Sequence, residues 1–323
     1  MIKTAVLVSI IIGAALPHLP DGFALAHLFQ SFPIGVYAVL CGLSAGIAAV
    51  VFRRRAAISA AALILASWSV AASAMMLREN SPAAGKDGLS IITWNTHYWD
   101  QLDGPENFAD QLRQMNADVV LLQEHIYRAA DSGRSRDIDD ADALKTCCGF
   151  EHVWSKGELV IASRLPGTPI PVDDPYVQVV SLRSGSDTVD VINVHVPVHV
   201  NITLSPTQRA FWSFVVDRHQ SRLASYAELE RVLAATDRAI VGGDFNSTVL
   251  MRPLRDALFA YTDMGIADLW PPTYPTGKSL PELWRLDILV GRNTGARRCS
   301  VMPMHPTMGS DHRPVRCEFA AAT

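Results

Sequence analysis

Two long apolar runs near the start of the chain constrain its fold more than any other feature. They cover 19 residues from Ile34 to Phe52 and 22 residues from Ala56 to Leu77, and neither contains a charge. A helix of about 20 apolar residues crosses the hydrocarbon layer of a bilayer. Neither run has a polar face, which favours transmembrane helices over the alternative, a pair of buried core helices. We therefore predict a membrane anchor over residues 1–77.

A shorter apolar run, from Thr4 to Leu16, leaves the number of transmembrane helices open between two and three. It is either a first span extended towards Asp21 or the apolar part of a signal peptide, and the lack of a clear small-residue cleavage site favours a span. Arg53–Arg55 separate the two long runs, and basic clusters in short loops stay in the cytoplasm. Everything after Leu77 is therefore expected on the periplasmic or exterior side of the cell (inner) membrane.

The rest of the chain has the composition of a soluble domain. Residues 86–323 hold 23 of the 28 basic residues and 30 of the 32 acidic ones, a net charge of −7. Phosphate contacts dominate nucleic-acid affinity, so this balance argues mildly against tight binding to a duplex. We predict a polar linker over residues 78–88 and one folded domain over residues 89–323.

The cysteines permit disulfides in an exported domain. Cys41 lies in a predicted span, and the remaining four are Cys147, Cys148, Cys299 and Cys317. An even number of cysteines outside the cytoplasm is compatible with pairing. We prefer Cys299–Cys317, on condition that their two segments are neighbouring strands, and four buried thiols are the alternative.

Short apolar segments alternate irregularly with helical patterns after the linker. Strands are expected at residues 89–95, 117–124, 158–163, 177–182, 188–196, 238–244, 286–290, 299–304 and 315–319. Helices are expected at residues 106–115 and from Ser205-Pro206, as N-cap and first turn, to about Ala235. Many short strands with interspersed helices suit an α/β fold of two packed sheets covered by helices.

Polar residues recur where the apolar strands end. The set consists of Asn95, Glu124, His195, Asp244 with Asn246, Asp287, and Asp311-His312. One carboxylate at a strand end is usually a turn residue or a helix cap. Six strands that lead to groups able to bind a metal or polarise a phosphate indicate one shared site. Gly242-Gly243, just before Asp244, are expected where backbone or substrate comes close.

In chain order, the segments WN, QE, N-x-H, GDFN, RLD and SDH resemble the endonuclease/exonuclease/phosphatase superfamily. This superfamily includes deoxyribonuclease I, abasic-site endonucleases, neutral sphingomyelinases and inositol polyphosphate 5-phosphatases. The likeness runs from about Leu89 to Phe319, and Gly157–Pro166 also looks like the family's strand that ends in Ser-Arg. The family's WRLDY reads WRLDI here, and the active-site tyrosine of abasic-site enzymes has no evident counterpart. This departure favours a general phosphodiesterase over a repair enzyme.

The resemblance implies a four-layer α/β sandwich, two packed mixed β-sheets flanked by helices, that follows the N-terminal transmembrane helices. It also implies a Mg²⁺-dependent attack of water on a phosphoester, with Mn²⁺ or Ca²⁺ as alternative cations. Hard cations take oxygen ligands, so Glu124 would be the first ligand and Asp311 would complete the metal site. Asn95 would either coordinate the metal or hold the phosphate through its amide.

The same resemblance assigns roles to the other residues of the set. Asp244 would orient and deprotonate the attacking water, and Asn246 would hold Asp244 or donate to a phosphoryl oxygen. His312 would stabilise charge on the phosphate, with Asp287 fixing its tautomer and raising its pKa. His195 would contact the phosphate or protonate the leaving oxygen.

These features predict a membrane-anchored phosphoester hydrolase, either a nuclease or a phospholipid or sphingomyelin phosphodiesterase. Its partners would be the phosphoester substrate, nucleic acid or a phospholipid head group, and the lipid bilayer; no protein partner can be inferred. A catalytically inactive, membrane-tethered binding or sensor module is the alternative, which the complete set of carboxylates and histidines disfavours. Other prominent residues are expected to be structural: His97, His125, His199 and His305 at the surface or in turns, Phe211, Trp212 and Phe214 on a helix core face, and Asp137–Asp142 in a solvated loop.

Overall fold

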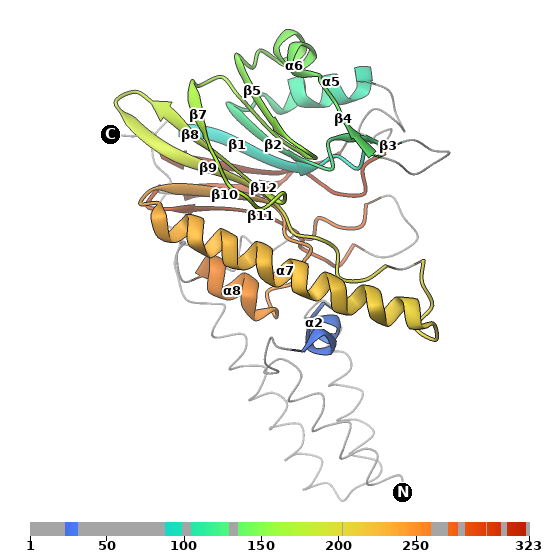
Figure 1. The fold of residues 1–323 in the computed structure, drawn as a ribbon. Coiled ribbons are helices and arrows are strands. Elements are labelled where there is room, and N and C mark those ends of the chain that lie inside the picture. The colour runs from blue at the N-terminus through green and yellow to red at the C-terminus, as the bar shows by residue number, and fades with distance from the viewer. Residues whose placement is uncertain are drawn as a thin grey trace, which may run out of the picture. The chain divides into compact units, whose positions relative to one another are not determined.

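The computed structural model describes residues 23–31, 88–98, 105–128, 135–201, 203–259, 271–276, 282–294, 296–304 and 309–320 (Figure 1). The predicted spans at residues 34–52 and 56–77 and the shorter run at residues 4–16 lie outside these stretches. Within the described stretches, no helix is long and apolar enough to cross a membrane.

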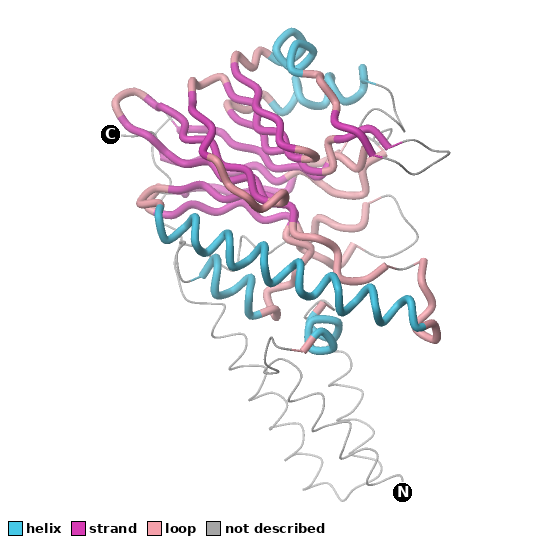
Figure 2. Tube along the Cα trace, viewed as in Figure 1, coloured by secondary structure: helices cyan, strands magenta, loops and turns pink. Residues whose placement is uncertain are grey.

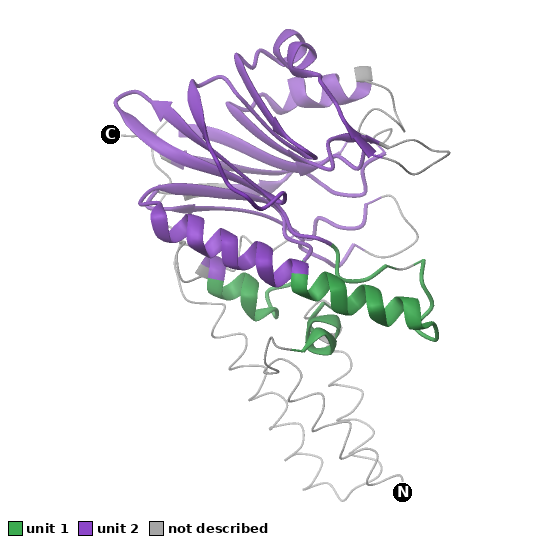
Figure 3. Ribbon diagram, in the orientation of Figure 1, with its two compact units in different colours: residues 1–77, 198–220, 247–256 green, residues 78–197, 221–246, 257–323 purple. Residues whose placement is uncertain are grey.

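The chain divides into two compact units, each assembled from separate stretches of sequence (Figure 3). Unit 1 comprises residues 1–77, 198–220 and 247–256, and unit 2 comprises residues 78–197, 221–246 and 257–323. Unit 1 contains α2 (Ala24–Gln30) and the first part of α7 (Arg209–Ala235). Every described strand belongs to unit 2.

The larger sheet of unit 2 has six strands in the order β12-β13-β1-β2-β6-β5. They are β1 (Gly88–Asn95), β2 (Val119–Gln123), β5 (His152–Lys156), β6 (Leu159–Ser163), β12 (Ala296–Val301) and β13 (Val315–Ala320). Only β1 and β2 are parallel neighbours. Successive side chains of a strand point to opposite faces, so Ile92 packs with α5 (Pro105–Met115) and α6 (Ala141–Cys148), whereas Ile91 packs against the second sheet.

The second sheet has five strands in the order β11-β10-β9-β8-β7. They are β7 (Gly167–Ile170), β8 (Val177–Ser184), β9 (Asp187–His195), β10 (Ala239–Asp244) and β11 (Asp287–Arg292). Here only β9 and β10 are parallel neighbours. Figure 2 shows the two sheets as stacked layers, and the core between them joins Leu121 of the larger sheet to Val191 and Leu289 of the smaller. Residues 221–235 of α7 follow the outer side of the smaller sheet (Figure 1).

The predicted architecture, mixed sheets flanked by helices, is confirmed. Each predicted strand is present, with ends shifted by no more than three residues. The predicted start of the long helix is wrong, because Ser205 begins a separate turn in which the backbone N–H of Gln208 donates to its carbonyl, and α7 starts at Arg209. The elements not predicted are α2, α6, α8 (Arg252–Phe259), β5, β7, and the small sheet formed by β3 (Ile126–Arg128) and β4 (Ser135–Asp137).

A polar cluster crosses the core and fixes how the two sheets align. Gln123 Nε2 donates to Asn193 Oδ1 at 2.7 Å and to Thr93 Oγ1 at 3.0 Å. Asn193 Nδ2 in turn donates to the carbonyls of Leu122 and Val160, at 2.9 and 3.1 Å. Gln123 and Asn193 are fully buried, and a buried polar group is costly unless it is hydrogen-bonded. A shift of β2 against β9 would break these bonds, so they specify one alignment.

Two disulfides occur in unit 2. Cys299 of β12 and Cys317 of β13 are register partners on neighbouring strands and are bonded, which confirms the preferred pair. The adjacent residues Cys147 and Cys148 at the end of α6 form a second disulfide that was not predicted.

Candidate active site

The topology of unit 2 brings the predicted site residues to one edge of the two sheets. Asn95 ends β1, and Glu124 follows the parallel strand β2. In the second sheet, His195 and Asp287 are both register partners of Asp244, the last residue of β10. His312 lies just before β13, which runs antiparallel to β1 and so begins where β1 ends. The convergence predicted from the strand ends is therefore present.

Asn95 connects the carboxylates of Glu124 and Asp244. Its Nδ2 donates to Glu124 Oε1 at 3.2 Å and to Asp244 Oδ2 at 3.0 Å, while its Oδ1 accepts the backbone N–H of His97 at 3.0 Å. Asn95 and Asp244 are each 1% exposed. The amide thus holds one carboxylate from each sheet, and its predicted role as a direct metal ligand stays a prediction.

A buried histidine–aspartate pair lies beside Asp244. His312 Nδ1 is 2.8 Å from Asp287 Oδ2, and His312 Nε2 is 3.7 Å from Asp244 Oδ2. Burial by itself lowers the pKa of His312, but the charges of Asp287 and Asp244 and the bond to Asp287 outweigh it and raise the pKa to about 10. The imidazole is therefore cationic at neutral pH, with Nε2 directed at the site.

A second histidine–carboxylate pair contains a residue that the sequence analysis missed. Glu158 Oε1 is 2.7 Å from His195 Nδ1, while His195 Nε2 lies 3.8 Å from Glu124 Oε1 and 3.9 Å from Asp244 Oδ2. Burial lowers the pKa of His195, but Glu158, Asp244 and Glu124 together raise it to about 9. An imidazolium accepts no hydrogen bond, so the 3.4 Å separation of Asn246 Nδ2 and His195 Nε2 is only a contact in this form.

Glu158 could have been found from its position in the sequence. It lies in the turn between β5 and β6, after Gly157, which has a φ of 57°. The segment GELVIASRLP was already part of the family resemblance, but only a strand was expected there. The side chain is a carboxylate at a strand start, facing a histidine from the other sheet.

Each of the two pairs takes one member from each sheet. Glu158 lies in the turn that joins β5 and β6 of the six-stranded sheet, and His195 ends β9 of the five-stranded sheet. Conversely, Asp287 begins β11 of the five-stranded sheet, and His312 precedes β13 of the six-stranded sheet. The site is therefore assembled by the packing of the sheets and not within either one.

Asp244 is fixed by Asn246. The backbone N–H of Asn246 donates to Asp244 Oδ1 at 2.8 Å, and its Nδ2 donates to Asp244 Oδ2 at 3.2 Å and to the carbonyl of Val196 at 3.0 Å. Burial raises the pKa of Asp244, and Asp287 adds to this rise, although His312, His195 and Asn95 oppose it. The net result is a carboxylate that is more basic than a solvated aspartate.

Local backbone conformation aims two of the site residues. Glu124 and Asn246 have φ values of 51° and 45°, which an asparagine tolerates better than a glutamate. Such residues cost about 1–3 kcal/mol and are concentrated at functional sites. Gly243 meets the predicted close approach: a Cβ at this position would lie 1.8 Å from the carbonyl oxygen of Val194.

Asp311 and His97 lie at the rim of the site. Asp311 is 7% exposed, its Oδ1 is 3.9 Å from His97 Nδ1, and its charge contributes to the raised pKa of His312. Its predicted role as a metal ligand stays a prediction.

Several residues outside the set differ from expectation. His125 lies in the connection between β2 and β3 but is not at the surface: it is buried, and its Nε2 lies 2.6 Å from Asp140 Oδ2. Asp140 is itself buried just before α6, so the segment 137–142 is not simply a solvated loop. Phe211 is buried as predicted, but Trp212 is 43% exposed. His305 lies outside the described residues.

The donor atoms of the site fit a hard divalent cation. Asp244, Asp287 and His312 each offer one atom within 4.8 Å of the others. His312 Nδ1 already lies 2.8 Å from Asp287 Oδ2, so this group is held together by a hydrogen bond and is suited to hold a proton. The carboxylate oxygens of Glu124, one of which accepts from the Asn95 amide, are the ligand type that Mg²⁺ prefers. Glu124, with 18% of its side chain exposed, is also reachable from solvent.

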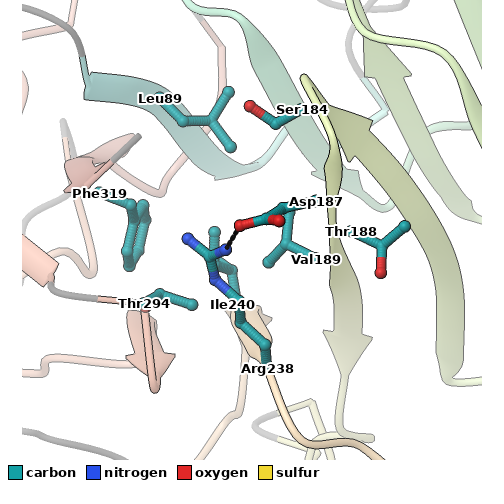
Figure 4. A pocket seen from close by; sticks show the side chains of 9 residues that line it. All are labelled: Leu89, Ser184, Asp187, Thr188, Val189, Arg238, Ile240, Thr294 and Phe319. Carbon is teal, nitrogen blue, oxygen red and sulfur yellow. Dashed lines mark hydrogen bonds and ion pairs between the residues drawn. The ribbon is translucent and has the colours of Figure 1, made fainter. Parts of the chain in front are cut away.

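A small hollow elsewhere in unit 2 has a different character (Figure 4). Leu89, Asp187 and Ile240, which help to line it, lie near the starts of β1, β9 and β10, whereas Asn95, His195 and Asp244 end those strands. The hollow holds an ion pair between Arg238 and Asp187 at 3.1 Å. It therefore lies at the opposite end of the strands from the candidate site.

Comparison with known proteins identifies the family. Residues 92–312 match the endonuclease/exonuclease/phosphatase family, and because this covers more than half of the chain, the chain belongs to that family. Its members hydrolyse phosphoester bonds and use divalent metals. No curated protein matches the sequence.

Solved structures show the same fold at low identity. A 3′ phosphatase from Neisseria, solved with a product DNA hairpin, is 18% identical with a TM-score of 0.52 over 72% of this chain and 99% of that one. Beta toxin from Staphylococcus aureus, a variant solved with bound magnesium ions, is 13% identical with a TM-score of 0.51 over 72% and 99%. A conserved protein of unknown function from Enterococcus faecalis is 15% identical with a TM-score of 0.51 over 72% and 100%.

Proposed function

We propose that this protein is a membrane-anchored, Mg²⁺-dependent phosphodiesterase that cleaves its substrate by attack of water. The observation that carries the proposal is the convergence of two cationic histidines on Asp244. His195 Nε2 and His312 Nε2 lie 3.9 and 3.7 Å from Asp244 Oδ2. The two cations are suited to bind an anionic substrate. The buried carboxylate is suited to accept the proton that the attacking water loses.

Asp244 acts on the water in this mechanism. Its two hydrogen bonds from Asn246 and one from Asn95 fix the carboxylate, and burial makes it a stronger base. General-base catalysis contributes about 10²–10⁴ in rate. A divalent ion held by Glu124 would supply Lewis-acid polarisation of a phosphoryl oxygen.

The two histidines act on the phosphoryl group. His312, held by Asp287, stabilises the negative charge that grows on the phosphoryl oxygens, a contribution of about 10²–10³ for one such donor. His195, held by Glu158, carries the proton that the leaving oxygen needs. Each carboxylate partner orients its histidine through Nδ1 and leaves Nε2 for the reaction.

Contacts inside unit 1 support the membrane topology. His27 Nδ1 lies 3.3 Å from His219 Nδ1, and Thr248 Oγ1 donates to the carbonyl of Gln30. In a membrane-anchored chain, these contacts require that His27 and Gln30 lie on the same side of the bilayer as His219 and Thr248. Two spans between them, at residues 34–52 and 56–77, meet this requirement. The catalytic domain would then lie outside the cytoplasm, opposite Arg53–Arg55.

The substrate is proposed from charge and location. A net charge of −7 over residues 86–323 disfavours a duplex, and an anchor keeps the domain close to phospholipid head groups. We therefore favour a phospholipid phosphodiester. DNA is the second candidate, for which the specific observation is the fold shared with the Neisseria 3′ phosphatase, solved with DNA.

A substrate panel tests the proposal. The full chain in lipid nanodiscs would be assayed on bis-p-nitrophenyl phosphate, p-nitrophenyl phosphate, plasmid DNA, RNA, sphingomyelin and phosphatidylinositol phosphates, with Mg²⁺ or with EDTA. We expect Mg²⁺-dependent cleavage of the diester bis-p-nitrophenyl phosphate in preference to the monoester p-nitrophenyl phosphate. We also expect cleavage of one of the lipids. An Asp244→Asn protein is the matched blank. Activity that survives EDTA, or that equals the blank on every substrate, would refute the proposal.

A further inference from the structure

Large apolar side chains are exposed mainly in unit 1. The described residues of this kind in unit 1 are Phe23, Leu25, Val198, Trp212 and Val216, at 64%, 49%, 41%, 43% and 51% exposure. The two in unit 2, Ile170 and Leu283, are 40% and 39% exposed. Single exposed apolar residues are ordinary, but a concentration of them in a minor share of the described chain marks an interaction surface.

The first half of α7 shows how this surface arises. Phe211 and Val215 form the buried stripe of the helix, at 5% and 3% exposure. Trp212 and Val216 each follow one of them by one position, so they form a second apolar stripe beside the first. The indole N–H of Trp212 donates to the carbonyl of Pro206 at 2.9 Å, which holds the ring in place. A helix that buries only one face needs only one apolar stripe. The second stripe of α7 is therefore available for a contact outside the protein.

The chain connects this surface to the predicted anchor. The last residue of α2, Gln30, lies four positions before Ile34, where the first long apolar run begins. Phe23 and Leu25 are therefore close in sequence to the bilayer, and the contact between His27 and His219 places α2 against α7. Aromatic residues such as Trp are enriched at the membrane–water interface.

The charge of unit 1 is also suited to a membrane. Its described segments carry four arginines and two aspartates, whereas residues 86–323 have a net charge of −7. Basic residues near an anionic bilayer are attracted to its surface. Anionic lipid would therefore attract the basic described segments of unit 1, although the domain as a whole is acidic.

We propose that Phe23, Leu25, Trp212 and Val216 form a surface that rests in the head-group layer of an anionic bilayer. This rests on the membrane anchoring within the proposed function, and it adds a second attachment beyond the spans. Seating the domain in this way restricts its rotation about the anchor.

Contact labelling tests the surface directly. The full chain would be placed in nanodiscs of phosphatidylethanolamine and phosphatidylglycerol in which some lipids carry a photoactivatable carbene precursor near the head group. After irradiation, peptides would be mapped by mass spectrometry. We expect label on the peptides that contain Phe23, Trp212 and Val216, and none on those that contain Ile170 or Leu283, which are as exposed as Trp212.

Matched variants separate this proposal from the catalytic one. Trp212→Asp with Val216→Asp should lose the α7 label and keep hydrolysis of the soluble diester, while Ile170→Asp should change neither. Equal labelling of the Trp212 and Ile170 peptides in the wild-type protein would overturn the surface, as would full retention of the α7 label in the double variant. Because labelling needs no catalysis, an inactive protein that is still labelled at Trp212 would refute the phosphodiesterase and support the surface.

Discussion

His195 owes its charge to a residue that lies far away in the sequence. Replacing Glu158 by Gln keeps the shape of the side chain but removes the charge closest to the imidazole. The pKa of His195, about 9 in the folded protein, should then fall towards its ordinary value. An NMR titration of the imidazole in EDTA would measure this, with Glu151→Gln, at an exposed position, as the control.

The same pair predicts how stability depends on pH. A folded pKa of about 9 against an ordinary value of 6.5 means that the contribution of His195 is complete below pH 6.5 and is lost as pH rises through 9. In EDTA, the free energy of unfolding of the wild-type protein should therefore fall more steeply across this window than that of Glu158→Gln. Parallel curves from denaturant titrations would contradict the pairing.

Kinetics against Mg²⁺ concentration should separate metal ligand from base. Glu124→Gln removes a charge from the proposed metal site, so its apparent Mg²⁺ affinity should weaken and raised Mg²⁺ should restore part of the rate. Asp244→Asn should lose about 10²-fold or more at any Mg²⁺ concentration, and His312→Ala should be rescued equally poorly. If saturating metal restored Asp244→Asn and not Glu124→Gln, the two roles would be reversed.

Residues at strand ends could be predicted from the sequence, whereas pairs between strands could not. Asn95, Asp244 and His195 follow or end apolar runs, and the parallel order of those runs brings them to one edge. Glu158 was missed because its importance depends on His195, which reaches it from the other sheet. The burial of His125 could not be predicted for a similar reason, since its partner Asp140 lies just before α6, a helix that the acidic segment 137–142 did not indicate.

At the scale of elements, the pairing of β10 with β9 depends on the missing side chain of Gly243. Gly243→Ala would place a Cβ 1.8 Å from the Val194 carbonyl oxygen, so β9 and β10 would have to separate. At Gly185, with a φ of 65° and no heavy atom within 4 Å of the added Cβ, the change to Ala should cost only the left-handed strain, about 1–2 kcal/mol. Thermal unfolding should therefore show a much larger loss for Gly243→Ala. Equal losses would mean that β10 can move without cost.

The predicted elements share one property, a strong apolar pattern. β2 and β6 are buried along their whole length, and short apolar runs of this kind, bounded by turn residues, are typical of buried strands. The missed strands lack it: β7 is mostly exposed and β5 only half-buried. The start of α7 was misplaced because Ser205-Pro206 resembles a helix start but forms an isolated turn.

For the whole molecule, the two disulfides should differ in their effect on stability. Cys299 and Cys317 are 18 residues apart, and closing a loop of this size contributes about 3 kcal/mol in the chain-entropy model. Cys147 and Cys148 are adjacent, so their bond closes almost no loop. Replacing the first pair by Ser should therefore lower the unfolding midpoint in denaturant, and replacing the second should lower it far less. An equal effect would contradict the loop argument.

The proposed topology predicts where a fused reporter works. A fluorescent protein that folds only in the cytoplasm should stay dark when fused after Thr323, and a periplasm-active phosphatase at the same position should be active. The reverse result would place the catalytic domain on the same side as Arg53–Arg55 and refute the topology.

The division of each histidine–carboxylate pair between the two sheets has a consequence for how the protein matures. Under the proposed mechanism, either sheet alone holds only one member of each histidine–carboxylate pair, so a nascent or partly folded chain would be catalytically silent. Hydrolytic competence would then appear in one step, when the Gln123–Asn193 bridge forms and the layers dock. A protein that crosses the membrane before it folds would in this way be harmless to phosphoesters in the cytoplasm. Recovery of turnover during refolding would report the docking of the layers, and not the earlier formation of secondary structure.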